Sequence, residues 1–353
     1  MSYLVRGLQG LTPYVPGEHT EDPDAIRMNS NESPYPPSPL VLDVMAKAAP
    51  GLNYYNDPDC MELRAALARH HGGKPENFIC GNGSDQILFL SFLAFADAEN
   101  PIAIPDVTYS YYPDFARVLG IPVHRIPLTE EYCIAPEDYM GIGMMKVFPN
   151  PNAPTGRFLP LPDIERIAAS DREHVLVVDE AYIDFGGNSA YGLTKAHPNI
   201  LVVRTFSKSG CLAGLRLGYG MGDPALIGEL HRVRSSIDLY GVNRLSQAAG
   251  ITALDHWEYY RENAARIMAS REGLTRELTA LGFTVLPSLT NFVFASPSFM
   301  PAGELFLALK RRRILVRHWD SERVSDWLRI SIGTEEQCRS LVEAIREIRG
   351  EKK

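Results

Sequence analysis

Five short, mostly apolar runs constrain the fold of this chain more than any other feature of its sequence. Each run is followed by a polar or glycine-bearing loop, and amphipathic stretches separate one run from the next. Strands with one solvated face alternate apolar and polar side chains, so runs without alternation are typical of strands covered on both faces. The pattern predicts an α/β domain with helices packed on a mostly parallel sheet. The runs occupy residues 78–80, 102–104, 144–148, 175–178 and 200–203.

A change of sequence character near residue 250 predicts a second domain. A long charged helical stretch over residues 255–281 leads into short strand-like runs and a final amphipathic helix. The N-terminal segment is rich in proline and asparagine and is expected to be extended. We therefore expect an N-terminal arm over residues 1–35, a large α/β domain over residues 36–250 and a smaller α+β domain over residues 251–353.

Composition argues against several classes of partner. Of the 353 residues, 45% are hydrophobic, and the formal net charge of -8 gives no reason to attract nucleic acid or anionic lipid. No apolar stretch approaches the roughly 20 residues of a membrane span, and no secretory signal is apparent. The five cysteines contain no Cys-x-x-Cys pair, so neither a disulfide framework nor a metal site is predicted. We expect a cytoplasmic protein.

The loop after the run at residues 200–203 contains a lysine suited to covalent chemistry. Lys208 stands in the segment Thr-Phe-Ser-Lys-Ser-Gly, at the end of a predicted strand. A lysine amine there can form an imine with an aldehyde cofactor, and the hydroxyls of Thr205 and Ser207 can donate to a phosphate. A loop lysine alone is explained equally well as a surface residue, so the interpretation depends on its neighbours.

A carboxylate and a phenol follow the run at residues 175–178. Asp179 comes directly after that run, and Tyr182 lies three residues further on. The ring of pyridoxal phosphate (PLP) acts as an electron sink only when its nitrogen is protonated, which requires a nearby carboxylate. Tyr182 can bond the 3′ oxygen of the same ring. The alternative is that Asp179 only caps the next loop.

The loop after the first run has the features of an anion site. Gly83, Ser84 and Asp85 separate that run from an apolar helix, so backbone N–H groups and the positive end of the helix can face the ligand. The spacing matches neither the P-loop nor the dinucleotide fingerprint, which weighs against a nucleotide. Arg216 can add a second positive charge, although a structural ion pair is the alternative.

Two further strand ends offer contacts to the ring. Tyr109 follows the run at residues 102–104 and can stack on the pyridine face, although a core tyrosine is nearly as plausible. Asn152 lies in Asn-Pro-Asn-Ala-Pro-Thr-Gly, whose prolines fix a tight loop against the cofactor edge. Since ligands of such sheets bind beyond the carboxyl ends of the strands, the five loops can surround one PLP molecule.

The order of these segments resembles the fold-type-I PLP-dependent aminotransferases. GNGSD, VTYSYY, NPNAPTG, VVDEAY and TFSKSGCLAGLR occur in the order typical of that family, with LTPY before them and ILVR and LRISIG after them. The resemblance covers essentially the whole chain and is strongest to the histidinol-phosphate aminotransferases. It implies a transamination between histidinol phosphate and 2-oxoglutarate, in histidine biosynthesis.

The resemblance also implies roles for individual residues. Lys208 would bind the cofactor covalently and move the proton, Asp179 would pair with the ring nitrogen, and Tyr182 would bond the 3′ oxygen. Tyr55 would reach the cofactor phosphate of a neighbouring subunit, which makes the active unit a homodimer. The other implied contacts are Ser84, Asp85, Thr205, Ser207 and Arg216 at the phosphate, and Tyr14, Arg317 and Arg329 at the substrate.

Two positions depart from the family pattern. Ala153 stands where family members commonly have an asparagine that bonds the 3′ oxygen. Either Asn152 takes over that bond or Tyr182 carries it alone. Ser33 stands where another asparagine is usual in the arm, so the substrate contacts of that segment are not implied.

Three alternative functions are consistent with the same motifs. A decarboxylase of threonine phosphate would use nearly the same residues to cleave a different bond. An aromatic or other amino acid aminotransferase would share the chemistry. A noncatalytic, aminotransferase-like sensor would carry an additional helix-turn-helix domain, for which we expect no room in this chain.

Overall fold

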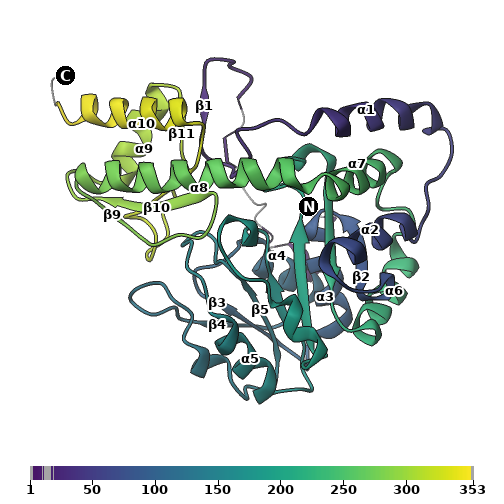
Figure 1. Cartoon of the computed structure of the whole chain (residues 1–353). Coiled ribbons are helices and arrows are strands. Elements are labelled where there is room, and N and C mark those ends of the chain that lie inside the picture. Colours follow the sequence, from purple (N-terminus) through teal and green to yellow (C-terminus); the bar gives the residue numbers. More distant parts are fainter. Residues whose placement is uncertain (1–2, 10, 12–16, 19, 351–353) are drawn as a thin grey trace.

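The computed structural model describes residues 3–9, 11, 17–18 and 20–350 of the chain (Figure 1). Its larger sheet has seven strands in the order β2-β8-β7-β6-β5-β3-β4. Pairing is parallel from β4 through β7, whereas β8 runs antiparallel to both β7 and β2. The predicted mostly parallel sheet is therefore confirmed. The strands are β2 (Phe78–Asn82), β3 (Ile102–Pro105), β4 (Val123–Ile126), β5 (Met145–Pro149), β6 (Leu176–Asp179), β7 (Ile200–Thr205) and β8 (Leu217–Met221).

The five predicted runs all form strands, and β4 and β8 join them without having been predicted. β4 is an edge strand and is only partly buried. β8 begins directly after Arg216 and contains two glycines in five residues, so its sequence lacks the run of apolar residues that is typical of a buried strand. One of them is required by packing, because a Cβ at Gly218 would overlap the amide nitrogen of Ser84. This close approach sets the start of the helix α3 (Ser84–Phe95) against β8.

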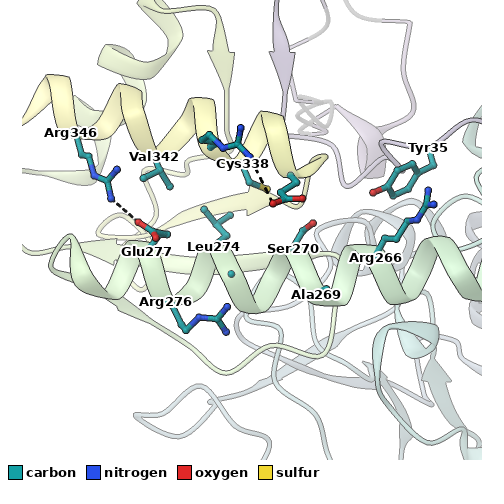
Figure 2. A pocket seen from close by; sticks show the side chains of 13 residues that line it. Tyr35, Arg266, Ala269, Ser270, Leu274, Arg276, Glu277, Cys338, Val342 and Arg346 are labelled. Atoms are coloured by element: carbon teal, nitrogen blue, oxygen red, sulfur yellow. Dashed lines mark hydrogen bonds and ion pairs between the residues drawn. The ribbon is translucent and has the colours of Figure 1, made fainter. Parts of the chain in front are cut away.

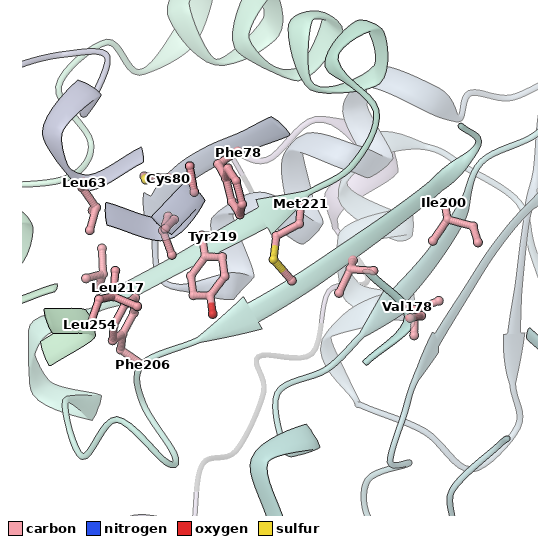
Figure 3. Packing of buried hydrophobic residues seen from close by; sticks show 14 of the residues in the cluster. Leu63, Phe78, Cys80, Val178, Ile200, Phe206, Leu217, Tyr219, Met221 and Leu254 are labelled. Carbon is pink, nitrogen blue, oxygen red and sulfur yellow. The ribbon is translucent and has the colours of Figure 1, made fainter. Parts of the chain in front are cut away.

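Alternate residues along the strands face two different hydrophobic cores. Val178 and Val202 face a core built with α1, α2, α5 and α7, which Figure 3 shows from close by. Val177 and Leu201 face a second core built with α3, α4 and α6. Burial on both faces explains why the runs lack alternation. The helices are α1 (Pro39–Ala48), α2 (Met61–His71), α3 (Ser84–Phe95), α4 (Tyr111–Leu119), α5 (Leu161–Ser170), α6 (Pro224–Ile237) and α7 (Arg244–Asp255).

A smaller antiparallel sheet, with strand order β12-β10-β9, is covered by α8 and α10 (Figure 1). The long helix α8 belongs to both parts, since Tyr260 packs in the first core and Ile267 and Leu274 pack in the core of the small sheet. The N-terminal arm is tied to this part through the parallel pair β1 and β11. The domain boundary near residue 250 stays a prediction. The elements are β1 (Ile26–Arg27), α8 (Trp257–Ala280), β9 (Phe283–Val285), β10 (Phe292–Pro297), α9 (Ala302–Arg311), β11 (Ile314–Leu315), β12 (Leu328–Ser331) and α10 (Glu335–Ile348).

Two kinds of feature are missing from the described part of the chain. None of its helices combines the length and the apolar character needed to cross a membrane. Within the same residues, no group of three or more histidine, cysteine, aspartate or glutamate side chains is placed to hold a metal ion.

Candidate active site

A cavity of about 230 Å³ lies at the edge of the sheet where β5, β6 and β7 end. The last residues of these strands, Pro149, Asp179 and Thr205, all line it. Strand register places them together, because Pro149 is paired with Asp179 across β5 and β6. The cavity is also lined by Ser30, Glu32, Ser84, Asp85, Tyr109, Ala153, Ala181, Tyr182, Ser207, Lys208, Ala213 and Arg216. The structure thus brings most of the predicted site residues into one place.

Lys208 lies in the turn that follows β7. Its Nζ atom is 3.5 Å from the carbonyl oxygen of Ser30 and 5.8 Å from the centre of the Tyr182 ring. The amine therefore lies between the N-terminal arm and Tyr182, in the same cavity as the carboxylate of Asp179.

A buried ion pair anchors the turn that carries Lys208. Arg204, on β7, pairs with Asp184, and the hydroxyl of Ser209 donates to the other carboxylate oxygen of Asp184. The side chain of Arg204 is 9% exposed. Asp184 thus holds the chain on both sides of Lys208.

Replacing Asp184 with alanine is expected to lower the free energy of unfolding by about 3–5 kcal/mol, because it removes the hydrogen-bonded partner of the buried guanidinium of Arg204. Chemical denaturation of the apoprotein measures this loss. The matched control is Asp163→Ala, which breaks an exposed pair with Arg166 and should cost less than about 1 kcal/mol. Equal losses in the two variants would contradict a structural role for the buried pair.

Asp179 is a buried carboxylate at the end of β6. Its Oδ2 atom accepts a hydrogen bond from the Tyr112 hydroxyl at 2.8 Å, and its Oδ1 atom accepts one from the backbone N–H of Ala181 at 3.1 Å. Burial raises the pKa of Asp179 to about 6, while these hydrogen bonds and the charge of Lys208 oppose the rise. A cation bound beside it would favour the ionised form. The site is therefore suited to a protonated ring nitrogen.

Tyr112 is a functional residue that the sequence reasoning missed. It is fully buried on α4, and burial together with the charge of Asp179 raises the pKa of its hydroxyl well above the ordinary value. The hydroxyl therefore stays protonated and donates to Asp179. Its place in Val-Thr-Tyr-Ser-Tyr-Tyr, directly after a strand, was a usable signal.

The start of α3 and Arg216 form the anion-binding end of the cavity. Asp85 accepts hydrogen bonds from Arg216 and from the Tyr109 hydroxyl, each at 2.9 Å. Its carboxylate thus orients these two side chains, while the first-turn N–H groups of α3, including those of Ser84 and Asp85, are left for the anion. Gly83 has φ of +81°, and a Cβ there would lie 2.7 Å from Nη2 of Arg216. Glycine suits both the positive φ and the close approach of the guanidinium.

Two hydroxyls complete this end. Thr205 Oγ1 donates to Ser207 Oγ at 2.9 Å and accepts from the Ser207 backbone N–H at 3.0 Å. Ser207 Oγ is in turn 3.5 Å from Nη1 of Arg216. Hydroxyl and guanidinium donors that lie next to one another at this end of the cavity suit a phosphate group.

The expectation that Asn152 contacts the cofactor is corrected by the structure. Its amide nitrogen donates to the carbonyl oxygen of Val107 at 3.1 Å and to Thr155 Oγ1 at 2.9 Å. These bonds hold the turn between two loops, and Ala153, not Asn152, lines the cavity. Of the two possibilities left open by the sequence, the structure favours Tyr182 as the contact to the 3′ oxygen.

The two arginines predicted at the substrate lie beside the arm and outside the residues that line the cavity. Nη2 of Arg329, on β12, donates to the carbonyl oxygen of Asn29 at 2.8 Å. The guanidinium groups of Arg317 and Arg329 lie 5.2 Å and 5.3 Å from the Trp319 ring. They form a neighbouring cationic pair on the small-domain side.

The last two predicted residues are separate from the cavity or outside the described part of the chain. Tyr55 is 79% exposed and stacks on Tyr240 with 4.5 Å between the ring centres. Tyr14 lies outside the residues that the structure describes.

A larger hollow of about 680 Å³ lies between α8 and α10 (Figure 2). An ion pair of 2.7 Å between Arg346 and Glu277 bridges its two helices, and Arg266 stacks on Tyr35 at its other end. Its lining includes none of the predicted site residues. Size alone therefore does not locate the active site.

Comparisons with known proteins agree with the geometry of the cavity. A family model described as aminotransferase class I and II matches residues 23–345. The histidinol-phosphate aminotransferase of Aromatoleum aromaticum is 46% identical over 346 residues, which covers 97% of this chain and 97% of that protein. The chain belongs to the class I and II aminotransferase family. The expected enzyme class, a PLP-dependent aminotransferase, is thereby confirmed.

Other relatives of this aminotransferase support the same fold. Histidinol-phosphate aminotransferase 1 of Methylococcus capsulatus is 44% identical, over 98% of this chain and 97% of that protein. The solved structure of the histidinol-phosphate aminotransferase of Sinorhizobium meliloti, in complex with PLP, has a TM-score of 0.89 and 26% identity over 99% of each chain. Threonine-O-3-phosphate decarboxylase of Porphyromonas gingivalis has a TM-score of 0.79 at 21% identity, over 92% of this chain and 99% of that one. That last similarity shows the fold alone.

The residues of this aminotransferase fit PLP. The cavity offers an amine at Lys208, a carboxylate for the ring nitrogen at Asp179, a phenol at Tyr182 and a guanidinium at Arg216. The buried Asp179, whose pKa is raised by burial, is the feature that fits a cationic ring most specifically.

Proposed function

We propose that the chain transfers an amino group between histidinol phosphate and 2-oxoglutarate, as a step of histidine biosynthesis. The observation that carries the proposal is the 43–46% identity, over at least 95% of the chain, to relatives that bear the name histidinol-phosphate aminotransferase. The matched regions also cover at least 95% of each of these relatives.

Each catalytic side chain has a separate task in this proposal. When bound, PLP supplies the electron sink that makes the Cα–H bond of the amino donor acidic. Lys208 Nζ would take that proton from Cα of the donor and deliver it to the cofactor carbon that receives the amino group, which is general acid–base catalysis. Asp179 holds the ring nitrogen in its charged form, and Arg216 with the α3 N-terminus binds the phosphate.

Arg317 and Arg329 are proposed to bind the anionic ends of the substrates. A guanidinium can donate two parallel hydrogen bonds to either a carboxylate or a phosphate ester. One cationic pair can therefore bind both 2-oxoglutarate and histidinol phosphate. Their position beside the arm supports this assignment, because the arm also contributes Ser30 and Glu32 to the cavity.

A substrate screen tests the proposal directly. The purified protein, reconstituted with PLP, is assayed for glutamate formation from histidinol phosphate and 2-oxoglutarate, with aromatic amino acids as competing donors. Carbon dioxide release from threonine phosphate is measured in parallel. The highest kcat/KM is expected with histidinol phosphate. Carbon dioxide release without glutamate formation would instead identify a decarboxylase.

The protein is also proposed to act as a homodimer. Exposed apolar side chains occur from residue 52 to the start of α2 and from the end of α6 to residue 240, and the stacked pair of Tyr55 and Tyr240 brings these two segments together. Clustered apolar exposure of this kind marks an interface. The side chains are Leu52, Tyr54, Tyr55, Met61, Ile237, Leu239 and Tyr240.

Tyr55→Phe is expected to weaken PLP binding by roughly tenfold while leaving the dimer intact. The change removes one hydroxyl, proposed to donate to the cofactor phosphate of the partner subunit, and a hydrogen bond to a charged group contributes about 1.5 kcal/mol or more. Cofactor titration and sedimentation measure the two effects. Tyr54→Phe is the matched control and should change neither.

A cytoplasmic location and the domain division at residue 250 complete the proposal. The described cysteines are all free thiols, which suits a reducing compartment. The two separate hydrophobic cores, which pack against different parts of the length of α8, support the division into two domains.

A further inference from the structure

Asn31, in the N-terminal arm, touches Tyr182 inside the protein. Its Nδ2 atom is 3.0 Å from the Tyr182 hydroxyl oxygen. Asn31 is 1% exposed and Tyr182 is 8% exposed. The contact therefore joins two residues that are 151 positions apart in a place where water does not compete for the hydrogen bond.

Ser331, on β12, fixes the orientation of the Asn31 amide group. The Ser331 hydroxyl oxygen accepts the Asn31 backbone N–H at 2.8 Å, and the same hydroxyl donates to Oδ1 of Asn31 at 2.8 Å. With the amide turned over, the Ser331 hydroxyl would have to accept a second N–H, and its own hydrogen would lose Oδ1 as an acceptor. Asn291 also donates to the Asn31 carbonyl oxygen at 2.9 Å. The nitrogen of the amide is thereby directed at Tyr182.

The direction of this hydrogen bond decides what Tyr182 can do. An amide N–H can only donate, so the Tyr182 oxygen accepts and keeps its own hydrogen for another acceptor. Ala153, which lines the same cavity and packs in the same hydrophobic cluster as Tyr182, has a methyl side chain that offers no hydrogen bond. Tyr182 is thus a donor toward the space in which the cofactor is proposed to bind.

We infer that Asn31 is a positioning residue, which keeps the Tyr182 hydroxyl a hydrogen-bond donor to the 3′ oxygen of PLP and ties it to β12. This inference rests on the proposed function, since it needs the cofactor in that cavity. β12 also carries Arg329, two residues before Ser331. The arm therefore links the proposed substrate-binding strand to the cofactor-binding tyrosine.

The visible absorption of the PLP-loaded protein provides a test that does not depend on turnover. A hydrogen bond to the 3′ oxygen takes up part of its negative charge. The oxygen then attracts the proton on the adjacent lysine–cofactor nitrogen less strongly, so the pKa of that nitrogen is lowered. Removing the Asn31 amide weakens the donor. The pH midpoint of the absorption change should therefore move upward in Asn31→Gly, by roughly half a unit or more.

Glycine is the suitable replacement because Asn31 has φ of +54°, which glycine adopts without strain. Asn31→Asp is the second variant: its carboxylate accepts the Tyr182 hydrogen instead of donating, so the upward shift should be larger. The charged and titratable groups that line the cavity are unchanged in Asn31→Gly, whereas Asn31→Asp adds one carboxylate beside Tyr182. The lining groups are Glu32, Asp85, Tyr109, Asp179, Tyr182, Lys208 and Arg216.

Asn199→Ala is the matched control. Asn199 is another buried asparagine, whose amide donates to the carbonyl oxygens of Ala168 and Asp171, outside the cavity. This variant should lower the melting temperature and leave the midpoint unchanged. An unchanged or lower pH midpoint in Asn31→Gly would overturn the inference about Asn31. The proposed cofactor would still be supported in that case, because the chromophore would be present. Absence of the chromophore from the unsubstituted protein would overturn both.

Discussion

Lys208→Ala is expected to abolish measurable transamination. General acid–base transfer of a proton typically contributes roughly 10²–10⁴-fold, and the variant also loses the covalent attachment of the cofactor. No other described lysine lines the cavity, so no nearby amine can replace it. The effect on the proton transfer itself is measured in single-turnover experiments with histidinol phosphate, in which the loss of cofactor absorption is monitored over time.

Lys195→Ala is the control for Lys208, because Lys195 is an exposed lysine on another segment. It should retain full activity and a normal absorption spectrum. Retention of near-normal turnover by Lys208→Ala would remove the lysine from the mechanism. Restoration of activity by a small added amine would instead support its role as the proton carrier.

Asp179→Asn is expected to lower kcat by roughly 10²–10³-fold, because a neutral amide cannot hold the ring nitrogen in its charged form. The amide is close in size to the carboxylate, so the Tyr112 contact and the fold should survive. Circular dichroism and the melting temperature check that the variant is folded. A variant with unchanged kcat would contradict the pairing of Asp179 with the ring.

The raised pKa of Asp179 also predicts how cofactor binding depends on pH. Burial brings the pKa of the free carboxyl to about 6, so below that pH the apoprotein carries a neutral acid where the ring needs an anion. The affinity of the apoprotein for PLP should fall by roughly tenfold for each unit of pH below 6. Fluorescence titration between pH 5 and pH 8 measures this slope. Asp179→Asn should lose it.

The sequence predicted those parts of the site that follow directly from strand ends. Asp179 and Lys208 come after buried strands, and parallel strands deliver their last residues to one edge of the sheet. Ser84 and Arg216 were identified by the same reasoning, from a glycine turn into a helix and from proximity to the lysine loop. Local pattern was sufficient because each residue is placed by its own strand or helix.

Residues placed by tertiary contacts were not predictable in this way. Tyr112 reaches Asp179 only because α4 packs on the sheet, and Asn31 reaches Tyr182 only because the arm crosses to β12. Asn152 was assigned to the ring because of its loop, but the loop turns its amide toward Val107. A one-dimensional pattern contains the loop but not the direction of its side chains.

The central claim is that one amine holds the cofactor, and chemical trapping tests it most directly. The PLP-loaded protein is reduced with borohydride, digested with a protease and analysed by mass spectrometry, with Lys208→Ala treated in parallel. The account predicts that the pyridoxyl modification is found on the peptide that contains Lys208 and is absent from the variant. Modification of a different lysine in the unsubstituted protein, or of none, would contradict it.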